Sequence, residues 1–192
     1  MKISKNYSTT DWIKLKFDSE QDWEEACKIF YDRLYSRFLK PIKMIEDYEF
    51  SGFVIMALDC LLIETYQQFY NGEKETPKRK SKEYFKQFFN DTSFKEDFKE
   101  RMADMFYDHV RCGILHQAET KSNTKIKIND NLPIVKYAKN ENGLIINRTK
   151  FHKKLISIIN SYIKDLRNPT NEDLRKNFQK KMNYICRIDS NE

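Results

Sequence analysis

The sequence predicts a mainly α-helical protein with one small β insert. Its 192 residues contain only four glycines and four prolines, too few for the many turns of an all-β domain. Apolar residues recur at helical spacing over most of the chain, whereas residues 124–147 alternate between apolar and polar. With 40% hydrophobic and 14% aromatic residues, the chain has the material for a substantial core. We therefore expect residues 1–192 to form a single domain built as a helical bundle.

The N-terminal half predicts two long helices. The first begins after Ser19, because serine is a favoured N-cap and apolar residues follow at helical spacing. Pro41 is expected to end or kink this helix. The second is almost wholly apolar and runs from about residue 50 to 70, where an Asn-Gly pair closes it. Residues 1–18 show no clear pattern, and we expect them to be poorly anchored.

The middle of the chain predicts two further helices of different length. A charged connection over residues 72–82 leads into a short aromatic helix at about 81–90. Ser93 followed by Glu96 resembles a capping box and predicts the start of a long helix. This long helix is expected to end near His116.

The C-terminal part begins with a β insert at about 124–147. Its three short alternating runs are separated by asparagine-rich turns, which predicts a hairpin or a three-stranded meander. A helix follows at about 149–167, and Thr170 is expected to cap a basic C-terminal helix at about 170–187. The expected architecture is four core helices over about residues 19–168, plus accessory helices and the insert.

Positive charge is concentrated at the C-terminal end. The net charge is +6, and residues 1–147 carry 24 basic and 24 acidic side chains, so the whole excess lies in residues 148–192. A basic segment suits a polyanionic partner such as RNA, and we single out Lys150, Lys153 and Lys154 as candidate RNA-binding residues. A solvated helix face explains the same pattern.

Several classes of protein do not fit the sequence. The four cysteines are far apart and give neither a disulfide framework nor a zinc motif, as is typical of a reducing cytoplasm. The first twelve residues lack the apolar stretch of a secretion signal, and no run approaches the roughly 20 apolar residues of a membrane span. No glycine-rich phosphate loop is present. We expect a cytoplasmic protein without membrane association, cofactor or metal.

The residues best suited to catalysis are Arg111 and His116. An imidazole can take up and release a proton near neutral pH, and a guanidinium can donate two hydrogen bonds to phosphoryl oxygens. Together they suit metal-independent cleavage of an RNA phosphodiester. Residues five apart on a straight helix are, however, separated by about 140° around its axis. A loosened turn at Gly113, or freedom of the helix end, would be needed to bring the two side chains together.

Two carboxylates are candidates for supporting roles. Asp59 and Glu64 lie in the apolar second helix, where a buried acid usually has a partner. Either one orients Arg111 or His116, or it belongs to an ordinary salt bridge.

Other residues near the motif have structural interpretations beside the functional ones. Gln117 either binds substrate or caps the helix. His109, Cys112 and His116 share one helical stripe, but no fourth metal ligand is recognisable, and His109 is expected to be a packing residue. His152 lies among lysines and is expected to be solvated.

The segment Arg-Cys-Gly-Ile-Leu-His-Gln-Ala-Glu-Thr, residues 111–120, resembles the Arg-x4-His motif of the HEPN superfamily. The wording of this segment is similar to one bacterial HEPN subgroup, and residues 57–70 have the character of the same subgroup. The resemblance covers about residues 20–168. It implies a HEPN-like fold and a metal-independent endoribonuclease, often a toxin or an antiviral-defence effector. It also implies a homodimer whose two Arg111/His116 pairs line one cleft, with an antitoxin or another defence protein as a possible partner.

Cys112 departs from the family pattern, because many active relatives have a polar residue directly after the arginine. This leaves open a non-catalytic HEPN module that binds RNA or a protein partner and has a regulatory role. A purely structural dimerisation domain is a third reading. An enzyme predicts that Arg111 and His116 converge in an open, positively lined cleft, whereas a binding module predicts that the two are splayed apart or buried.

Overall fold

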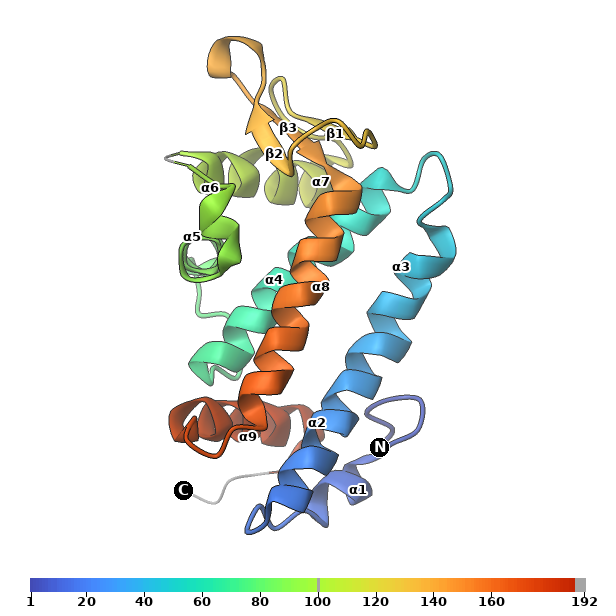
Figure 1. Cartoon of the computed structure of the whole chain (residues 1–192), viewed down its shortest axis with the longest axis vertical. Helices are drawn as coiled ribbons and strands as arrows, with labels where there is room; N and C mark the ends of the chain where they lie inside the picture. The colour runs from blue at the N-terminus through green and yellow to red at the C-terminus, as the bar shows by residue number, and fades with distance from the viewer. Residues whose placement is uncertain (100, 189–192) are drawn as a thin grey trace. The chain divides into compact units, whose positions relative to one another are not determined.

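The computed structural model describes residues 1–99 and 101–188, and it confirms a mainly α-helical fold with a small β insert (Figure 1). Contacts within the chain divide it into two compact units. The first unit comprises Met1–Ile45, Gln68–Glu75 and Ile159–Glu192, and the second comprises Glu46–Gln67 and Thr76–Ile158. That the whole chain is one domain stays a prediction. No helix within the described residues combines the length and apolarity needed to cross a lipid bilayer.

The first unit begins with better-anchored residues than the sequence indicated. The short helix α1 (Thr9–Ile13) buries Trp12, and the indole Nε1 donates a hydrogen bond to Asn183 Oδ1 at 2.8 Å. A buried indole with a satisfied N–H fixes its segment firmly. The next helix, α2 (Glu20–Leu34), begins where predicted, and Ser19 caps it by accepting a hydrogen bond from a backbone N–H of the first turn.

Pro41 does not end the first long helix, so one of its two expected effects is wrong. A π-helical turn, Tyr35–Leu39, follows α2 and leads directly into α3 (Lys40–Ile45), which contains the proline. In this turn the N–H of Lys40 bonds to the carbonyl of Tyr35, five residues earlier. A widened turn relieves both the clash of the proline ring with the preceding turn and the loss of its N–H.

The final helix of the first unit, α9 (Glu172–Cys186), has Asn171 as its N-cap instead of the predicted Thr170. The Thr170 hydroxyl donates to Asn168 Oδ1 at 2.9 Å, and the same oxygen accepts the backbone N–H of Thr170. This local turn occupies the threonine side chain, so the helix begins one residue later than the capping pattern indicated.

In the second unit, two helices follow the prediction closely. The helix α4 (Gly52–Asn71) starts here and ends in the first unit, and α5 (Ser81–Asp91) matches the short aromatic helix. The helix α8 (Arg148–Leu166) also starts in the second unit and ends in the first.

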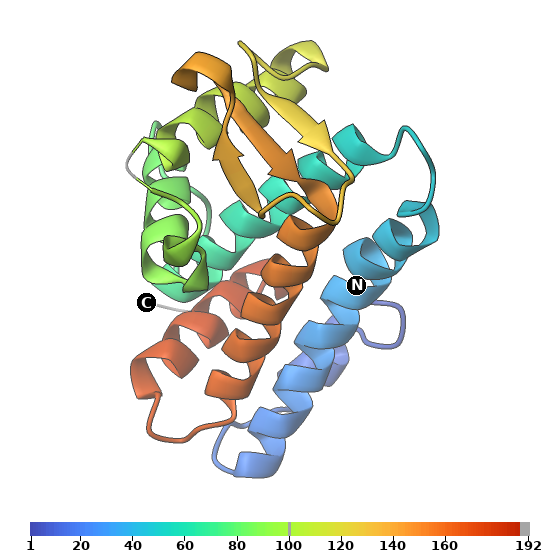
Figure 2. The ribbon, with the colours of Figure 1, turned by 45° about the horizontal axis from the view of Figure 1, so that its top comes forward.

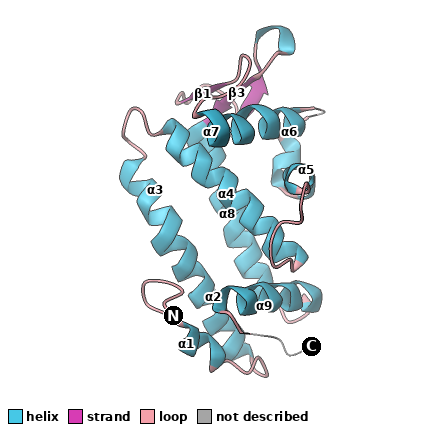
Figure 3. Ribbon diagram, turned by 180° about the vertical axis from the view of Figure 1, so that it is seen from behind, coloured by secondary structure: helices cyan, strands magenta, loops and turns pink. Residues whose placement is uncertain are grey.

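The predicted long helix is shorter than expected at its start. Thr92, not Ser93, caps only a 3-10 turn, Ser93–Glu96. The helix itself starts at α6 (Met102–Met105), passes through a π-helical segment (Phe106–Arg111) and ends with α7 (Cys112–Gln117). Figure 3 shows α6 and α7 in line beside the sheet. The 3-10 turn directs two phenylalanines of residues 94–98 into the core, which a continuous helix from residue 93 need not do.

The core of this unit is a cluster of aromatic rings, called here the phenylalanine cluster. All of its members are at most 7% exposed. It consists of Phe85, Phe89, Phe94, Phe98, Phe106 and Phe151. Phe106 opens the π-helical segment and stacks on Phe151 of α8 with ring centres 5.1 Å apart. The cluster therefore ties the helix that carries Arg111 to α5 and α8.

The β insert contains the predicted hairpin, but it is not a meander. Its strands are β1 (Lys125–Lys127), β2 (Val135–Tyr137) and β3 (Leu144–Asn147), in the order β1-β3-β2 (Figure 2). β2 and β3 pair antiparallel, whereas β1 pairs parallel with β3. Contacts from the end of β3 and the first turn of α8 hold the β1–β2 connection: Asn147 Nδ2 donates to the Asn129 carbonyl at 2.7 Å, and Lys150 Nζ donates to the Asp130 carbonyl at 2.7 Å. Alternation predicts strands but not their order, and these contacts set it.

Candidate functional site

Arg111 ends the π-helical segment and is held from two sides. Its Nη2 lies 3.3 Å from Glu64 Oε2 on α4, and its guanidinium lies 5.4 Å from the centre of the Tyr107 ring. Each side chain of the ion pair is 20% exposed. Burial pulls the pKa of Arg111 down, but Glu64, Tyr107 and Cys112 outweigh it and raise the pKa above its ordinary value. The guanidinium is therefore charged and oriented, and Glu64 is the carboxylate that contacts it.

His116 lies in the last turn of α7 and is exposed. Within the described part of the chain it forms no hydrogen bond or ion pair, and none links it to Arg111. Residues 112–117 are α-helical, so the two side chains leave the helix about 140° apart. Of the two ways considered for bringing the pair together, Gly113 lies within the α-helical residues of α7, and the helix ends at Gln117, one residue after His116. One chain therefore does not bring the predicted pair to a common point.

The π-helical segment connects this helix to the β insert. The N–H of Cys112 donates to the Tyr107 carbonyl five residues earlier, which marks the widened turn. The chain then folds back on the helix, and the N–H of Lys121 donates to the His109 carbonyl at 2.9 Å. The His109 ring lies 3.1 Å from Thr124 Oγ1, just before β1, and burial lowers the pKa of this histidine. His109 thus has the packing role expected from the sequence.

Gly113 is the point where the returning chain lies closest to the helix. A Cβ at this position would lie 2.5 Å from the Glu119 carbonyl oxygen and 3.2 Å from the Thr120 Cα. We expect Gly113→Ala to lower the free energy of unfolding by about 1–3 kcal/mol, because a clash with backbone outweighs the roughly 1 kcal/mol by which alanine favours a helix.

Chemical denaturation measures this effect, with Gly52→Ala as the matched control. A Cβ at Gly52 would lie 3.3 Å from the Ile126 Cγ2 methyl, so a shift of a few tenths of an ångström accommodates it and its effect is expected to be smaller than that of Gly113→Ala. Stabilisation by Gly113→Ala would contradict the close approach of residues 119–121.

Cys112 and Gln117, the other two candidates near the motif, are not held by a close backbone contact of the kind found at Gly113. Cys112 is a free thiol of intermediate exposure, and Gln117 is exposed. Gln117 makes no hydrogen bond within residues 1–99 and 101–188. In the same residues, no group of three or more histidine, cysteine or acidic side chains is placed to hold a metal ion.

Asp59 is paired with His152 instead of with Arg111 or His116. The Asp59 side chain is fully buried, and its Oδ1 lies 2.6 Å from His152 Nδ1. His152 is only 8% exposed, so the expectation that it is solvated is wrong. Burial raises the pKa of Asp59, although His152 and Arg148 oppose this effect. The sequence does contain the signal, because His152 shares a helix face with the apolar Leu155.

Arg148 is a second buried residue that sequence reasoning missed. It is 3% exposed, and its Nη1 donates to Ser51 Oγ at 2.9 Å. Its Nη2 donates to the Glu46 carbonyl at 2.8 Å. The guanidinium thereby fixes the segment that precedes α4 to the first turn of α8. A position in a basic C-terminal segment gave no indication of this structural role.

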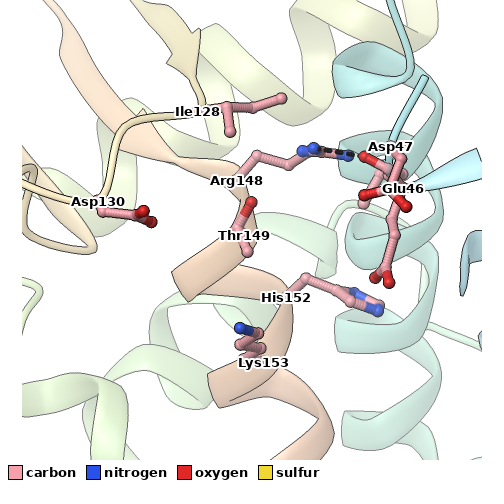
Figure 4. Close-up of a pocket in the computed structure, with 9 residues that line it drawn as sticks. Glu46, Asp47, Ile128, Asp130, Arg148, Thr149, His152 and Lys153 are labelled. Carbon is pink, nitrogen blue, oxygen red and sulfur yellow. Dashed lines mark hydrogen bonds between the residues drawn. The ribbon is translucent and has the colours of Figure 1, made fainter. Parts of the chain in front are cut away.

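A pocket of about 390 Å³ lies beside the buried side chains of Arg148 and His152 (Figure 4). It is lined by α8, by the segment before α4 and by the β1–β2 connection. The α8 residues at its wall are Arg148, Thr149, His152 and Lys153. All of these segments belong to the second unit.

The three candidate RNA-binding lysines have different surroundings. Lys150 Nζ donates to the carbonyls of Asp130 and Leu132 at 2.7 and 2.8 Å. Lys154 Nζ lies 2.5 Å from a carboxylate oxygen of Asp97. Lys153 is exposed and has no hydrogen bond or ion pair within the described residues. Of these three, Lys153 alone is free to contact an external polyanion.

Comparison of the chain with protein-family models, with curated proteins and with solved structures finds no match.

Proposed function

We propose that this chain is a metal-independent endoribonuclease of the HEPN type that acts as a homodimer. The observation that carries the proposal is the setting of Arg111. Its guanidinium is oriented by Glu64 and Tyr107 and partly exposed, five residues before the exposed His116. A guanidinium has five N–H donors, and the contact with Glu64 uses one of them. Nε is buried, so the remaining donors of the two terminal nitrogens are the ones that suit the oxygens of an RNA phosphate.

The proposed reaction is transfer of the phosphoryl group to the neighbouring 2′-hydroxyl. One His116 takes the proton of the 2′-hydroxyl, and the 2′-oxygen forms a bond to phosphorus. The bond from phosphorus to the 5′-oxygen breaks, and that oxygen receives a proton from a second His116. Arg111 stabilises the charge that builds on the phosphoryl oxygens. The products are a 2′,3′-cyclic phosphate and a 5′-hydroxyl.

A dimer is part of the proposal because one histidine cannot be base and acid in the same step. Two exposed leucines support a contact between copies at this place. Leu61 is 43% exposed and lies one turn from Glu64, and Leu115 is 51% exposed and lies one turn from Arg111. Burial of these leucines would give a contact between copies its apolar area. A two-fold contact would place two Arg111 and two His116 side chains around one cleft.

Within this proposal, the protein is a cytoplasmic toxin or antiviral-defence effector. RNA is its substrate, and an antitoxin or another defence protein is its regulator. Lys153 is the lysine of the basic segment most available for RNA.

A non-catalytic HEPN module is the second candidate, and the ion pair with Glu64 favours it. A carboxylate 3.3 Å from the guanidinium competes with a phosphate for the same donors. Cys112 in place of a polar residue points the same way. In this case the dimer would bind RNA or a partner protein without cleaving it.

RNA cleavage by the purified chain in EDTA tests the proposal. We expect cleavage with cyclic-phosphate ends, reduced at least about a hundredfold by His116→Ala, since general acid–base catalysis contributes about 10² to 10⁴. A loss of the same order is expected for Arg111→Ala, because a charge-stabilising donor is removed. The matched control is Lys95→Ala, which removes an exposed charge on another segment.

Circular dichroism of each variant checks that the fold is retained. Equal cleavage by wild type, Arg111→Ala and His116→Ala would reject the catalytic pair. If the wild type leaves a broad RNA panel intact while still binding it, the non-catalytic module replaces the enzyme.

A further inference from the structure

We propose that one face of the helical stretch from α2 through α3 binds single-stranded RNA, whose bases stack on Tyr31 and Tyr35 and whose phosphates contact Lys40 and Lys43. These four residues are called here the tyrosine–lysine face, and all of them belong to the first unit. The choice of RNA as the polyanion rests on the proposed function, whereas the stacking and the phosphate contacts need no catalytic residue.

The first argument concerns the two tyrosine rings. Tyr31 and Tyr35 are 43% and 40% exposed, and they lie one turn apart on the helix. Their ring centres are 5.8 Å apart and their planes differ by 16°, so the two rings form a stack. No other ring of the described residues contacts this pair. A base also has a π-face and can continue such a stack, which is how many proteins bind single strands without regard to sequence.

The second argument concerns the π-helical turn, which places both lysines on the side of the rings. In an uninterrupted α-helix, residues five apart point about 140° away from each other. Here the N–H of Lys40 bonds to the carbonyl of Tyr35, five residues earlier, so these two residues lie on successive turns of one face. Lys43 follows three residues later on α3, which runs in line with α2, and shares that face (Figure 1). The widened turn therefore joins the stacked rings to a pair of cations.

The third argument concerns local charge. Residues 1–147 have no net charge as a whole, but residues 28–45 contain five basic side chains and one acidic side chain, Asp32. Asp32 is occupied by Asn6, whose backbone N–H and side-chain amide donate to it at 3.1 and 2.9 Å. Lys40 and Lys43 are exposed, and within the described part of the chain neither forms an ion pair. Both are therefore free to contact the phosphates of a polyanion.

The exposed side chains of this stretch suit a nucleic acid better than a lipid surface. Its large aliphatic residues Ile29, Leu34, Leu39 and Ile42 are buried, whereas Met44 is exposed. A helix that lies in a membrane interface needs a broad exposed apolar face. Flat rings with cations beside them are instead typical of surfaces that bind single strands.

Fluorescence anisotropy of the full chain with a labelled 2′-O-methyl oligouridine of about twelve nucleotides tests this proposal. Its 2′-oxygens are blocked, so binding is measured without cleavage. We expect Tyr31→Ala/Tyr35→Ala to weaken binding at least about fivefold, because the stacking of even one base contributes that much. Tyr31→Phe/Tyr35→Phe keeps the rings and is expected to bind like the wild type. The matched control is Tyr48→Ala/Phe50→Ala, which removes another pair of exposed aromatic rings, in the second unit.

The lysines are tested through the salt dependence of the same titration. We expect Lys40→Ala/Lys43→Ala to weaken binding and to reduce the slope of log Kd against log salt concentration by about 1.4, at about 0.7 for each phosphate contact with a single strand. The tyrosine variants remove no charge and are expected to keep the wild-type slope. The control Lys125→Ala/Lys127→Ala removes two exposed lysines of the second unit and is expected to bind like the wild type. Circular dichroism checks that each variant keeps the fold.

The proposal is overturned if Tyr31→Ala/Tyr35→Ala keeps wild-type affinity, or if the oligonucleotide does not bind. It is equally overturned if an RNA duplex of the same length binds as tightly, because paired bases are not free to stack. Binding to vesicles that contain phosphatidylserine, without binding to the oligonucleotide, would assign the face to a membrane instead. Because the oligonucleotide cannot be cleaved, failure of the chain to cleave RNA would reject the proposed ribonuclease and leave this binding result standing.

Discussion

Replacing His152 with alanine is expected to lower the free energy of unfolding by about 1–3 kcal/mol, the usual effect of leaving a buried polar group without its hydrogen-bond partner. Asp59 is fully buried, and the 2.6 Å contact with His152 is the hydrogen bond that the structure provides for its Oδ1. Its other oxygen is buried without a partner among the described residues. The variant therefore leaves a buried carboxyl group with neither water nor protein to satisfy it.

Chemical denaturation of a double-mutant cycle measures this interaction. The double variant Asp59→Ala/His152→Ala is expected to be less destabilised than the sum of the two single variants, because it removes both polar groups together. His116→Ala is the control, since this exposed histidine is expected to change the unfolding free energy by less than about 0.5 kcal/mol. Strict additivity of Asp59→Ala and His152→Ala would show that the two side chains do not interact.

The same pair predicts how stability depends on pH. Burial raises the pKa of Asp59 in the folded chain above its ordinary value of 3.8. The folded state therefore holds this proton more tightly than the unfolded state does. The contribution to stability is present below pH 3.8 and is lost as the pH rises through the folded pKa. Relative to Asp59→Asn, the wild type is expected to lose unfolding free energy over this rise, and a relative gain would contradict the raised pKa.

The second large effect is expected from Phe89→Ala, which should lower the free energy of unfolding by about 3–5 kcal/mol. Phe89 is fully buried, and its ring stacks on Phe98 with centres 3.8 Å apart. It also lies 5.0 Å from Phe106, at the start of the π-helical segment. Truncation removes the central ring of the phenylalanine cluster and leaves a cavity that several other rings cannot fill.

Denaturant titration again provides the measurement, with Phe50→Ala as the control. Phe50 is 71% exposed, so its removal is expected to change stability by less than about 0.5 kcal/mol. Phe89→Leu is expected to lie between the two, because leucine refills part of the space. Equal stability of Phe89→Ala and Phe50→Ala would mean that the cluster does not form the core of this unit.

Most helices were predictable because their signals are local. Ser19 caps α2, and a glycine follows the end of α4, as the sequence indicates. Of the two effects expected of Pro41, the end of the helix was wrong, because propensity does not reveal a widened turn that accepts the proline. The sequence left a hairpin and a meander open and could not predict the order β1-β3-β2, because alternation identifies strands without their neighbours.

The candidate site was predictable in part. The Arg-x4-His pattern is readable from the sequence, and Glu64 was among the carboxylates expected near Arg111. Sequence alone offers no means of choosing between Glu64 and Asp59 as the partner of Arg111, because both lie in the same apolar helix. Asp59 and Glu64 are five residues apart, so their side chains leave the helix in different directions. Which neighbour each one contacts depends on how the helices pack, and in the structure Asp59 contacts His152.

The parallel pairing of β1 with β3 imposes an order on how the insert assembles. Lys125 pairs with Ile145, 20 residues later, whereas β2 and β3 are joined by a short connection. A hairpin closes in about 1–10 μs, and pairing across a longer loop is slower. During synthesis β1 leaves the ribosome first but waits without a neighbour until β3 has been made. We therefore expect β2 and β3 to pair first, and β1, the first strand to be synthesised, to join the sheet last.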